Sequence, residues 1–321
     1  MQKEQLLDCH KRIKPYIHNT PVLTSRLINS MLGAEVFFKC ENFQRGGAYK
    51  MRGATNAILQ LTDEQRTKGV VTHSSGNFAQ ALSLAALNLG VTAHIVMPTS
   101  APRIKKLGVK EYKGKIYECD PSLQAREAMA KKIVREKEAV FLHPSNNLNV
   151  ILGQGTAAIE LFENYQDLNA IFCPVGGGGL IAGSSLAAYY FGNNCLVLGG
   201  EPFEADDAYR SLKSGKIETN TTTNTIADGL KTVLGDNTFP IIKKHVDSIV
   251  RVTEKEIISA MRLIWERMKI IVEPSSAVAL AALIRDGQDH PKRYREKKIG
   301  IIISGGNIDL DNLPFKKNKQ L

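Results

Sequence analysis

The sequence predicts an α/β protein of two domains, each an open, mostly parallel twisted sheet with helices on both faces. Short apolar runs recur along the chain, and segments of helical length with a period near 3.6 separate most of them. Strands that alternate with helices pair in parallel, because each helix returns the chain to the start of the next strand. The composition, 43% hydrophobic and 23% charged in 321 residues, is that of an ordinary globular chain.

The apolar runs short enough to be strands fall at residues 36–38, 70–72, 94–96, 115–117, 140–142, 171–175, 196–198 and 299–303. The helical period predicts helices at 50–61, 77–89, 122–136, 180–191, 254–269 and 275–284. No linker of biased composition divides the chain, so a second domain has to be inserted in the first. We predict a large domain from residues 1–66 plus 146–321 and a small inserted domain from residues 67–145.

Charge and cysteine usage narrow the class of protein. The net charge of +10 comes from scattered basic groups without interleaved aromatic residues, which favours a solvated basic surface over a nucleic-acid site. The five cysteines show no C-x-x-C spacing and are interpreted as buried thiols of a reducing compartment. The first residues do not form a basic and apolar leader, and no run of ~18 apolar residues occurs. We expect a cytoplasmic protein without nucleic-acid or membrane partners.

The first chemical motif is a lysine, Lys50, that follows Gly46-Gly47-Ala48-Tyr49 and opens an expected helix. The helix dipole disfavours a cation in the first turn by about 0.3–1 kcal/mol, which lowers the pKa of the amine and makes it a better nucleophile. A surface lysine is the alternative. The second motif, Ser74-Ser75-Gly76-Asn77, lies between a strand and a helix, where free amides bind a carboxylate or phosphate. An ordinary N-cap explains it equally well.

The third motif, Gly176-Gly177-Gly178-Gly179, follows the strand at 171–175 and is called the glycine loop below. Its uncovered amides can surround a phosphate at the start of the next helix, and packing alone would be a costly reason for four glycines. Gly177, Gly179 and Ala182 also match G-x-G-x-x-A, with Glu201 about twenty residues on, so a nicotinamide dinucleotide fold is a rival. The fourth motif, Ser304-Gly305-Gly306-Asn307, ends a strand at the edge where α/β sheets bind ligands.

Taken in this order, the four motifs resemble the fold-type II pyridoxal phosphate enzymes, which have the tryptophan synthase β-like fold. Within them the chain is most similar to the branch of serine racemase and serine/threonine dehydratase (threonine ammonia-lyase), from Thr20-Pro21-Val22-Leu23 to Asp309. The resemblance implies that Lys50 holds pyridoxal 5′-phosphate as a Schiff base and that Asn77 contacts the ring hydroxyl. It also implies that the phosphate lies in the glycine loop, that Tyr49 and Gly229 flank the ring, and that Ser304 faces the pyridine nitrogen.

The serine at the ring nitrogen has a chemical consequence. A hydroxyl cannot keep that nitrogen protonated as an aspartate would, so the ring is a weaker electron sink, and prompt loss of a β-leaving group is favoured over transamination. The resemblance makes Lys50 the general base on one face of the substrate. It places Ser75 on the other face, where it keeps racemisation possible; the alternative for Ser75 is a donor to the substrate carboxylate only.

The resemblance also implies a substrate site and a metal site. Ser74, Ser75, Gly76 and Asn77 would bind the substrate, and Arg126 could bind a second carboxylate, as in 3-hydroxyaspartate, or be a solvated helix charge. Glu201, the carbonyl of Ala205 and Asp207 would bind Mg²⁺ or Ca²⁺ through hard oxygen ligands. Two residues depart from the family pattern: Phe78 replaces its usual histidine, and Ser145 replaces the amide side chain of related racemases.

We therefore expect pyridoxal phosphate-dependent dehydration of L-serine, L-threonine or a related β-hydroxy amino acid to the 2-oxo acid and ammonia. Racemisation of serine is the alternative activity, and a nicotinamide-dependent dehydrogenase is a distant one. A non-catalytic, basic nucleic-acid-binding protein is the hypothesis from another class. We expect the protein to be a homodimer.

Overall fold

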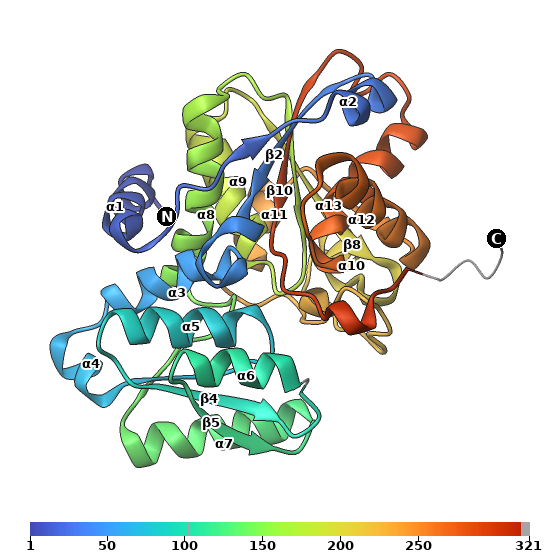
Figure 1. Cartoon of the computed structure of the whole chain (residues 1–321). Helices are drawn as coiled ribbons and strands as arrows, with labels where there is room; N and C mark the ends of the chain where they lie inside the picture. The colour runs from blue at the N-terminus through green and yellow to red at the C-terminus, as the bar shows by residue number, and fades with distance from the viewer. Residues whose placement is uncertain (102, 316–321) are drawn as a thin grey trace.

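A computed structural model describes residues 1–101 and 103–315 of the chain (Figure 1). Its strands form two sheets with helices on both faces, so the predicted fold class is confirmed. The larger sheet has the strand order β1-β2-β10-β7-β8-β9, and the smaller sheet has the order β5-β4-β3-β6. Within the described residues β1 runs antiparallel to β2, and every other strand pair is parallel.

The bounds of the strands are β1 (Val22–Leu23), β2 (Glu35–Cys40), β3 (Val70–His73), β4 (Ala93–Pro98), β5 (Lys115–Cys119), β6 (Val140–Phe141), β7 (Ala170–Pro174), β8 (Leu196–Pro202), β9 (Ser248–Val252) and β10 (Lys298–Ile303). The helices are α1 (Lys3–Ile13), α2 (Arg26–Leu32), α3 (Lys50–Leu59), α4 (Asp63–Lys68), α5 (Asn77–Asn88), α6 (Arg103–Glu111), α7 (Leu123–Lys137), α8 (Leu148–Asn164), α9 (Gly179–Phe191), α10 (Asp207–Ser214), α11 (Phe239–His245), α12 (Glu254–Met268) and α13 (Pro274–Asp289).

Each of the eight predicted strands and six predicted helices coincides with an element, but the sequence pattern missed others. Strand β1 has only two residues, and the edge strand β9 mixes buried with partly exposed positions, so neither gives a clear apolar run. Helix α8 is buried on nearly all sides. A helix that is buried all round lacks the exposed polar face by which the 3.6 period is recognised.

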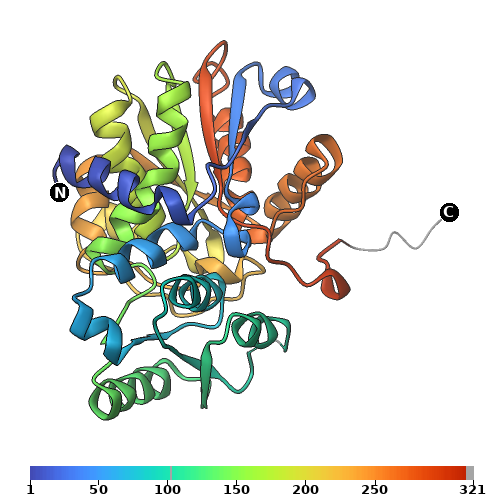
Figure 2. The same cartoon turned by 60° about the vertical axis from the view of Figure 1, so that its left-hand side comes forward.

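The strands divide between the two sheets in the order of the chain. Strands β3 to β6 form the smaller sheet and lie within residues 67–145, whereas the strands before and after them form the larger sheet. In both views the smaller sheet, with α6 and α7, lies below the larger one (Figure 2). One apolar cluster nevertheless continues from α5 through α3 to α8, so the core is shared between the two parts. The domain boundaries at 66/67 and 145/146 stay a prediction.

Side chains of the central strand β10 alternate between two cores. Ile302 belongs to the cluster that contains α8 and α9, while Ile301 and Ile303 belong to the cluster that contains α12 and α13. Successive side chains of a strand point to opposite faces of the sheet, so both faces of the larger sheet are covered by helices. The carboxyl end of β10 is thereby held in the middle of the molecule.

A fully buried arginine connects three elements beneath the expected site. Arg52 of α3 has no exposed surface and forms ion pairs with Glu41, which follows β2, and with Glu160 of α8, both at 2.7 Å. Lys39 lies 2.6 Å from Glu160 and also donates to the carbonyl of Thr20. Burial raises the pKa of Glu160, but hydrogen bonds and charge from Arg52 more than offset this and hold it below its usual value. Two cations and two anions therefore compensate one another in the core.

Replacing the arginine tests how much the fold depends on this network. The variant Arg52→Met leaves two buried carboxylates with only Lys39, so we expect the free energy of unfolding to fall by about 3–5 kcal/mol. Urea unfolding followed by circular dichroism measures it. The control Lys68→Met removes an exposed ion pair with Glu138 and should leave the urea midpoint nearly unchanged. Equal midpoints for Arg52→Met and the wild type would contradict a stabilising role for the network.

Candidate active site

The predicted motifs meet at the carboxyl ends of neighbouring strands. In the larger sheet, Lys50 follows β2, Ser304 follows β10 and the glycine loop follows β7, and these three strands are adjacent in the order β2-β10-β7. In the smaller sheet the loop with Asn77 follows β3 and contacts the larger part through Asn307. Parallel strands end at the same edge of a sheet, and this edge is where ligands of open α/β sheets bind.

The amine of Lys50 lies in an environment that favours its neutral form. The Nζ atom donates to the carbonyl oxygen of Pro144 at 2.8 Å and lies 5.0 Å from the ring centre of Tyr49 and 5.8 Å from that of Phe78. Burial lowers the pKa of Lys50 to about 7, although the charge of Glu273 opposes the shift. At neutral pH a substantial fraction of this amine is therefore neutral, and a neutral amine can act as a nucleophile and as a base.

The loop of residues 74–77 is partly exposed and borders open space. A Cβ atom added to Gly76 would meet no other atom within 4 Å. Ser74 Oγ accepts from the backbone N–H of Gly76 at 3.4 Å, and Asn77 begins α5. The Asn77 amide donates to Glu273 and accepts from Asn307. The hydroxyl of Ser75 has no hydrogen bond to another described residue, so it can serve a ligand.

The glycine loop is buried, and its four glycines have packing reasons that the sequence analysis discounted. A Cβ added to Gly176 would lie 2.9 Å from the carbonyl oxygen of Gly229, and one added to Gly178 would lie 2.7 Å from Leu234. Gly177 and Gly179 pack in the same way against Ser145, and Gly178 has a positive φ of 79°. The number of glycines is therefore not by itself evidence of a ligand.

The backbone N–H groups of the loop are stronger evidence for a bound ligand. Within residues 1–101 and 103–315, those of Gly176, Gly177 and Gly178 have no hydrogen-bond acceptor, and the first N–H groups of α9 have none within the helix. Buried N–H groups are almost always paired, and the positive end of a helix dipole adds to their attraction for an anion. The loop therefore fits a phosphate group.

The remaining expected cofactor residues lie against these two segments. Ser304 is buried, and its carbonyl accepts from the backbone N–H of Tyr49 at 3.0 Å. The N–H of Gly229 donates to Ser275 Oγ at 2.9 Å, and Gly229 packs against Gly176. The structure thus brings together the lysine, the glycine loop, Gly229 and the end of β10.

Sequence reasoning missed one buried acid in this site. Glu273 directly precedes α13 without capping it through its side chain, is 4% exposed, and accepts from Asn77 at 2.8 Å. Burial raises its pKa to about 8, with a further contribution from the charge of Asp228. The proline after it is typical of the first position of an ordinary helix, so nothing in the sequence marks this glutamate as part of a site. At neutral pH this group is largely a neutral carboxylic acid.

Arg126 and the turn of residues 201–207, called the acidic turn below, have no hydrogen bond or ion pair with this cluster among the described residues. Arg126 of α7 is partly exposed and donates weakly to the carbonyl of Ser122 at 3.5 Å. Burial lowers the pKa of His73, and the charge of Arg126 lowers it further. Glu201 is fully buried and accepts from the backbone N–H groups of Ala208 at 3.0 Å and Tyr209 at 2.9 Å. Among the described residues, no hydrogen bond or ion pair joins Arg126 to the loop of residues 74–77.

The two expected metal-binding acids are both buried, and each accepts two hydrogen bonds from neighbouring groups. Asp207 accepts from the N–H of Leu234 and from the side chain of Asn220. Burial raises the pKa of Glu201 well above its usual value, and the charge of Asp207 adds to the shift. The pKa of Asp207 is raised to about 6 by burial. Two buried carboxylates of this kind, beside the carbonyl of Ala205, have the oxygen chemistry that suits Mg²⁺ or Ca²⁺.

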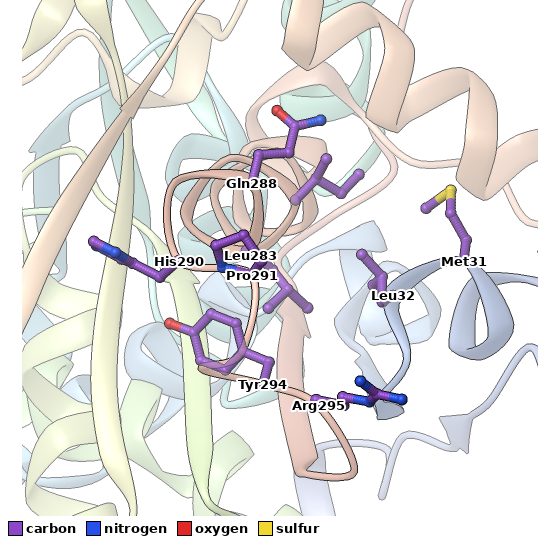
Figure 3. A pocket seen from close by; sticks show the side chains of 10 residues that line it. Met31, Leu32, Leu283, Gln288, His290, Pro291, Tyr294 and Arg295 are labelled. Atoms are coloured by element: carbon purple, nitrogen blue, oxygen red, sulfur yellow. The ribbon is translucent and has the colours of Figure 1, made fainter.

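A separate cavity of about 290 Å³ lies at the opposite end of β10 from Ser304, between α2 and the end of α13 (Figure 3). None of the expected site residues lines it. Its walls are formed by Met31, Leu32, Leu283, Ile284, Gly287, Gln288, His290, Pro291, Tyr294 and Arg295.

The fold and the site together fit an α/β enzyme with room for a phosphate group beside a buried lysine amine. Residues 13–305 match the family model described as pyridoxal-phosphate dependent enzyme, and the chain belongs to that family. The residues fit the cofactor: the glycine loop could hold its phosphate, Lys50 its aldehyde carbon and Asn77 its ring oxygen. In the part of the chain that the structure describes, no helix has the length and apolar character needed to span a membrane.

Relatives within the family cover almost the whole chain. Serine racemase of Dictyostelium discoideum is 49% identical over 97% of this chain and 96% of its own length, and its crystal structure superposes with a TM-score of 0.91. The β-hydroxyaspartate dehydratase of Paracoccus denitrificans (strain Pd 1222) is 47% identical over 97% of this chain and 98% of its own. The crystal structure of the T.th. threonine deaminase is 39% identical, covers 96% and 99% of the two chains and has a TM-score of 0.90.

The lowered pKa of Lys50 predicts how the apoprotein takes up the cofactor. Below pH about 7 the amine is protonated and unreactive, and above it the amine is neutral, so the rate of loading with pyridoxal 5′-phosphate should rise through pH about 7. Appearance of the visible absorption band measures this rate. Glu273 is largely protonated at this pH, so Glu273→Gln removes little negative charge and should leave the midpoint nearly unchanged. Lys50→Ala should give no band; a midpoint near 10.5, the ordinary lysine value, would contradict the assignment.

Proposed function

We propose that the protein eliminates water from L-serine, L-threonine or a related β-hydroxy amino acid, giving the 2-oxo acid and ammonia with bound pyridoxal 5′-phosphate. The observation that carries the proposal is the buried amine of Lys50, with a lowered pKa, held by an uncharged carbonyl beside a loop that fits a phosphate. Relatives named β-hydroxyaspartate dehydratase and threonine deaminase support dehydration. Glu201 accepts from the start of α10, which is not the role of a ribose-binding acid, so nothing favours a nicotinamide dehydrogenase.

The mechanism assigns one task to each residue. Bound pyridoxal phosphate supplies an electron sink for the charge that develops at the α-carbon. Lys50 removes the α-proton from one face as general base, and the carbonyl of Pro144 orients its Nζ atom. Tyr49 and Gly229 bound the space for the ring on its two sides. Ser304 offers the ring nitrogen a hydroxyl instead of a carboxylate, which favours rapid loss of the β-hydroxyl group.

Racemisation of serine is the second candidate function. The hydroxyl of Ser75 lies in a loop that borders open space and is not bonded to another described residue. A group placed there could return a proton to the face opposite Lys50, as racemisation requires. The similarity to serine racemase of Dictyostelium discoideum supports this activity.

The preferred substrate, the assembly and the location are further proposals. Arg126 is charged and partly exposed on the small-sheet side of the site and could receive a second carboxylate, which favours 3-hydroxyaspartate; the Paracoccus relative supports this. We also propose a homodimer, by its family resemblance, in the cytoplasm, where the five free thiols would stay reduced.

The two candidate activities separate at Ser75. In Ser75→Ala, interconversion of D- and L-serine should stop while elimination from L-serine, begun by Lys50, persists at a reduced rate. The reason is geometric, because one base cannot reach both faces of a planar carbanion. Chiral analysis of serine and the release of pyruvate measure the two reactions, in an assay panel that includes L-threonine and 3-hydroxyaspartate.

The matched control for this experiment is Ser74→Ala, which removes a hydroxyl from the same loop. It should lower racemisation and elimination in parallel, because Ser74 is expected only to bind the substrate. Unchanged racemisation in Ser75→Ala would refute the two-base assignment. A wild type that releases no ammonia from any member of the panel would overturn dehydration.

The acidic turn predicts a dependence on divalent cations. A cation between Glu201 and Asp207 would relieve the repulsion of two buried carboxylates, and a ligand bound only by the folded state raises stability by mass action. Chelator should therefore lower the melting temperature, and Mg²⁺ or Ca²⁺ should restore it. Glu201→Ala should lose this response, whereas Glu204→Ala, an exposed acid in the same turn, should keep it. Melting temperatures that ignore both chelator and cation would leave the turn without a metal role.

A further inference from the structure

The amide of Asn77 is held by residues far away in the sequence. Asn307, in the loop after β10, donates from Nδ2 to the carbonyl oxygen of Gly46 at 2.8 Å and to Asn77 Oδ1 at 3.0 Å. Asn77 in turn donates from Nδ2 to Glu273 Oε1 at 2.8 Å. Three side chains from three segments therefore form one chain of hydrogen bonds that starts at a backbone carbonyl.

That carbonyl decides which way each amide faces. A carbonyl oxygen can only accept a hydrogen bond, so the nitrogen of the Asn307 amide has to face Gly46. The second N–H of the same nitrogen then requires an acceptor, and the atom of Asn77 that faces it has to be the oxygen. The nitrogen of Asn77 consequently faces Glu273. The nitrogen and oxygen of an amide differ little in shape, so this hydrogen-bond logic is what distinguishes them.

Close packing keeps Asn307 in place. Gly47 has a positive φ of 72°, and a Cβ atom added there would lie 3.1 Å from the Cγ atom of Asn307. The turn before Lys50 thus has to be glycine both for its backbone conformation and for the approach of this side chain. Asn307 is therefore fixed by the same turn that introduces the lysine.

The network leaves Asn77 one group to offer a ligand. Its oxygen is engaged by Asn307, one N–H is engaged by Glu273, and the second N–H is available. We propose that Asn307 is a positioning residue that sets the Asn77 amide as a hydrogen-bond donor, and that this donor stabilises the ionised form of the ring oxygen of bound pyridoxal phosphate. The inference rests on the proposed function, which puts that oxygen at Asn77. Donation to a charged oxygen is stronger than to a neutral one, so a fixed donor favours ionisation.

Substitution of Asn307 should turn the Asn77 amide around or leave it free to rotate. In Asn307→Asp the carboxylate cannot donate to Asn77, so the amide turns its nitrogen toward residue 307 and its oxygen toward Glu273, which is largely protonated and can donate. The ligand then meets a lone pair where it met an N–H. In Asn307→Ala the amide is freed without any added charge. Both changes should favour the neutral ring hydroxyl.

The test is the absorption spectrum of the protein loaded with pyridoxal phosphate. At one fixed pH, the ratio of the visible band of the ionised form to the near-ultraviolet band of the neutral form should fall about tenfold in both variants, which corresponds to ~1.4 kcal/mol. The matched control is Asn42→Asp, which adds the same charge and also loses a bond to a carbonyl, that of Ile271, without contacting Asn77. Its ratio should equal that of the wild type.

Each outcome decides the inference. A wild-type ratio in Asn307→Ala overturns it, and this variant decides alone if Asn307→Asp does not fold. A lower melting temperature of the apoprotein with an unchanged ratio would show a merely structural role and also overturns it. An equal fall in Asn42→Asp would assign the effect to charge and contradict the amide mechanism. If the wild type itself gains no visible band, the proposed function fails first; a normal wild-type band with unchanged variants defeats only this inference.

Discussion

Burial of Arg52 is the constraint on which the geometry around Lys50 depends. A guanidinium without contact to water has to have its N–H groups paired, and here Glu41, Glu160 and Thr156 accept them. These acceptors come from the end of β2 and from α8, so the network fixes the rotation and the height of α3 between them. Lys50 begins the same helix two residues earlier. The position of its amine therefore depends on a buried network of charged side chains that does not contact the ligand.

Glycine contacts extend this constraint from α3 to the glycine loop. A Cβ atom added to Gly153 of α8 would lie 2.6 Å from the carbonyl of Arg52, and one added to Gly155 would lie 2.6 Å from the carbonyl of Gly183 in α9. The backbones of α3, α8 and α9 therefore approach one another directly, and no side chain separates them. The glycine loop leads into α9, so the lysine and the expected phosphate site are set by one stack of three helices.

This dependence explains what the sequence could and could not predict. Lys50, Asn77, the glycine loop and Ser304 each follow an apolar run, and the rule that parallel strands end at a common edge is enough to bring them together. Glu273 and the carbonyl of Pro144 carry no such pattern, because their roles arise from burial and from contacts across more than ninety residues. Helix α8 was missed for the same reason: it is buried on nearly all sides, and polar residues such as Glu160 lie inside the protein instead of forming an exposed polar face.

The two titratable groups at the site, Lys50 and Glu273, have uncharged hydrogen-bond partners for a chemical reason. An ion pair between Lys50 and Glu273 would hold the amine as an ammonium group, which is neither a nucleophile nor a base. Each group is instead bonded to an uncharged partner, Lys50 to the Pro144 carbonyl and Glu273 to the Asn77 amide. Burial then lowers the pKa of the amine to about 7 and raises that of the acid to about 8, so at neutral pH a substantial fraction of the amine and most of the acid are neutral. The protein thereby keeps a reactive amine and a neutral acid in one site, because neither group has a charged partner within hydrogen-bond distance among the residues described.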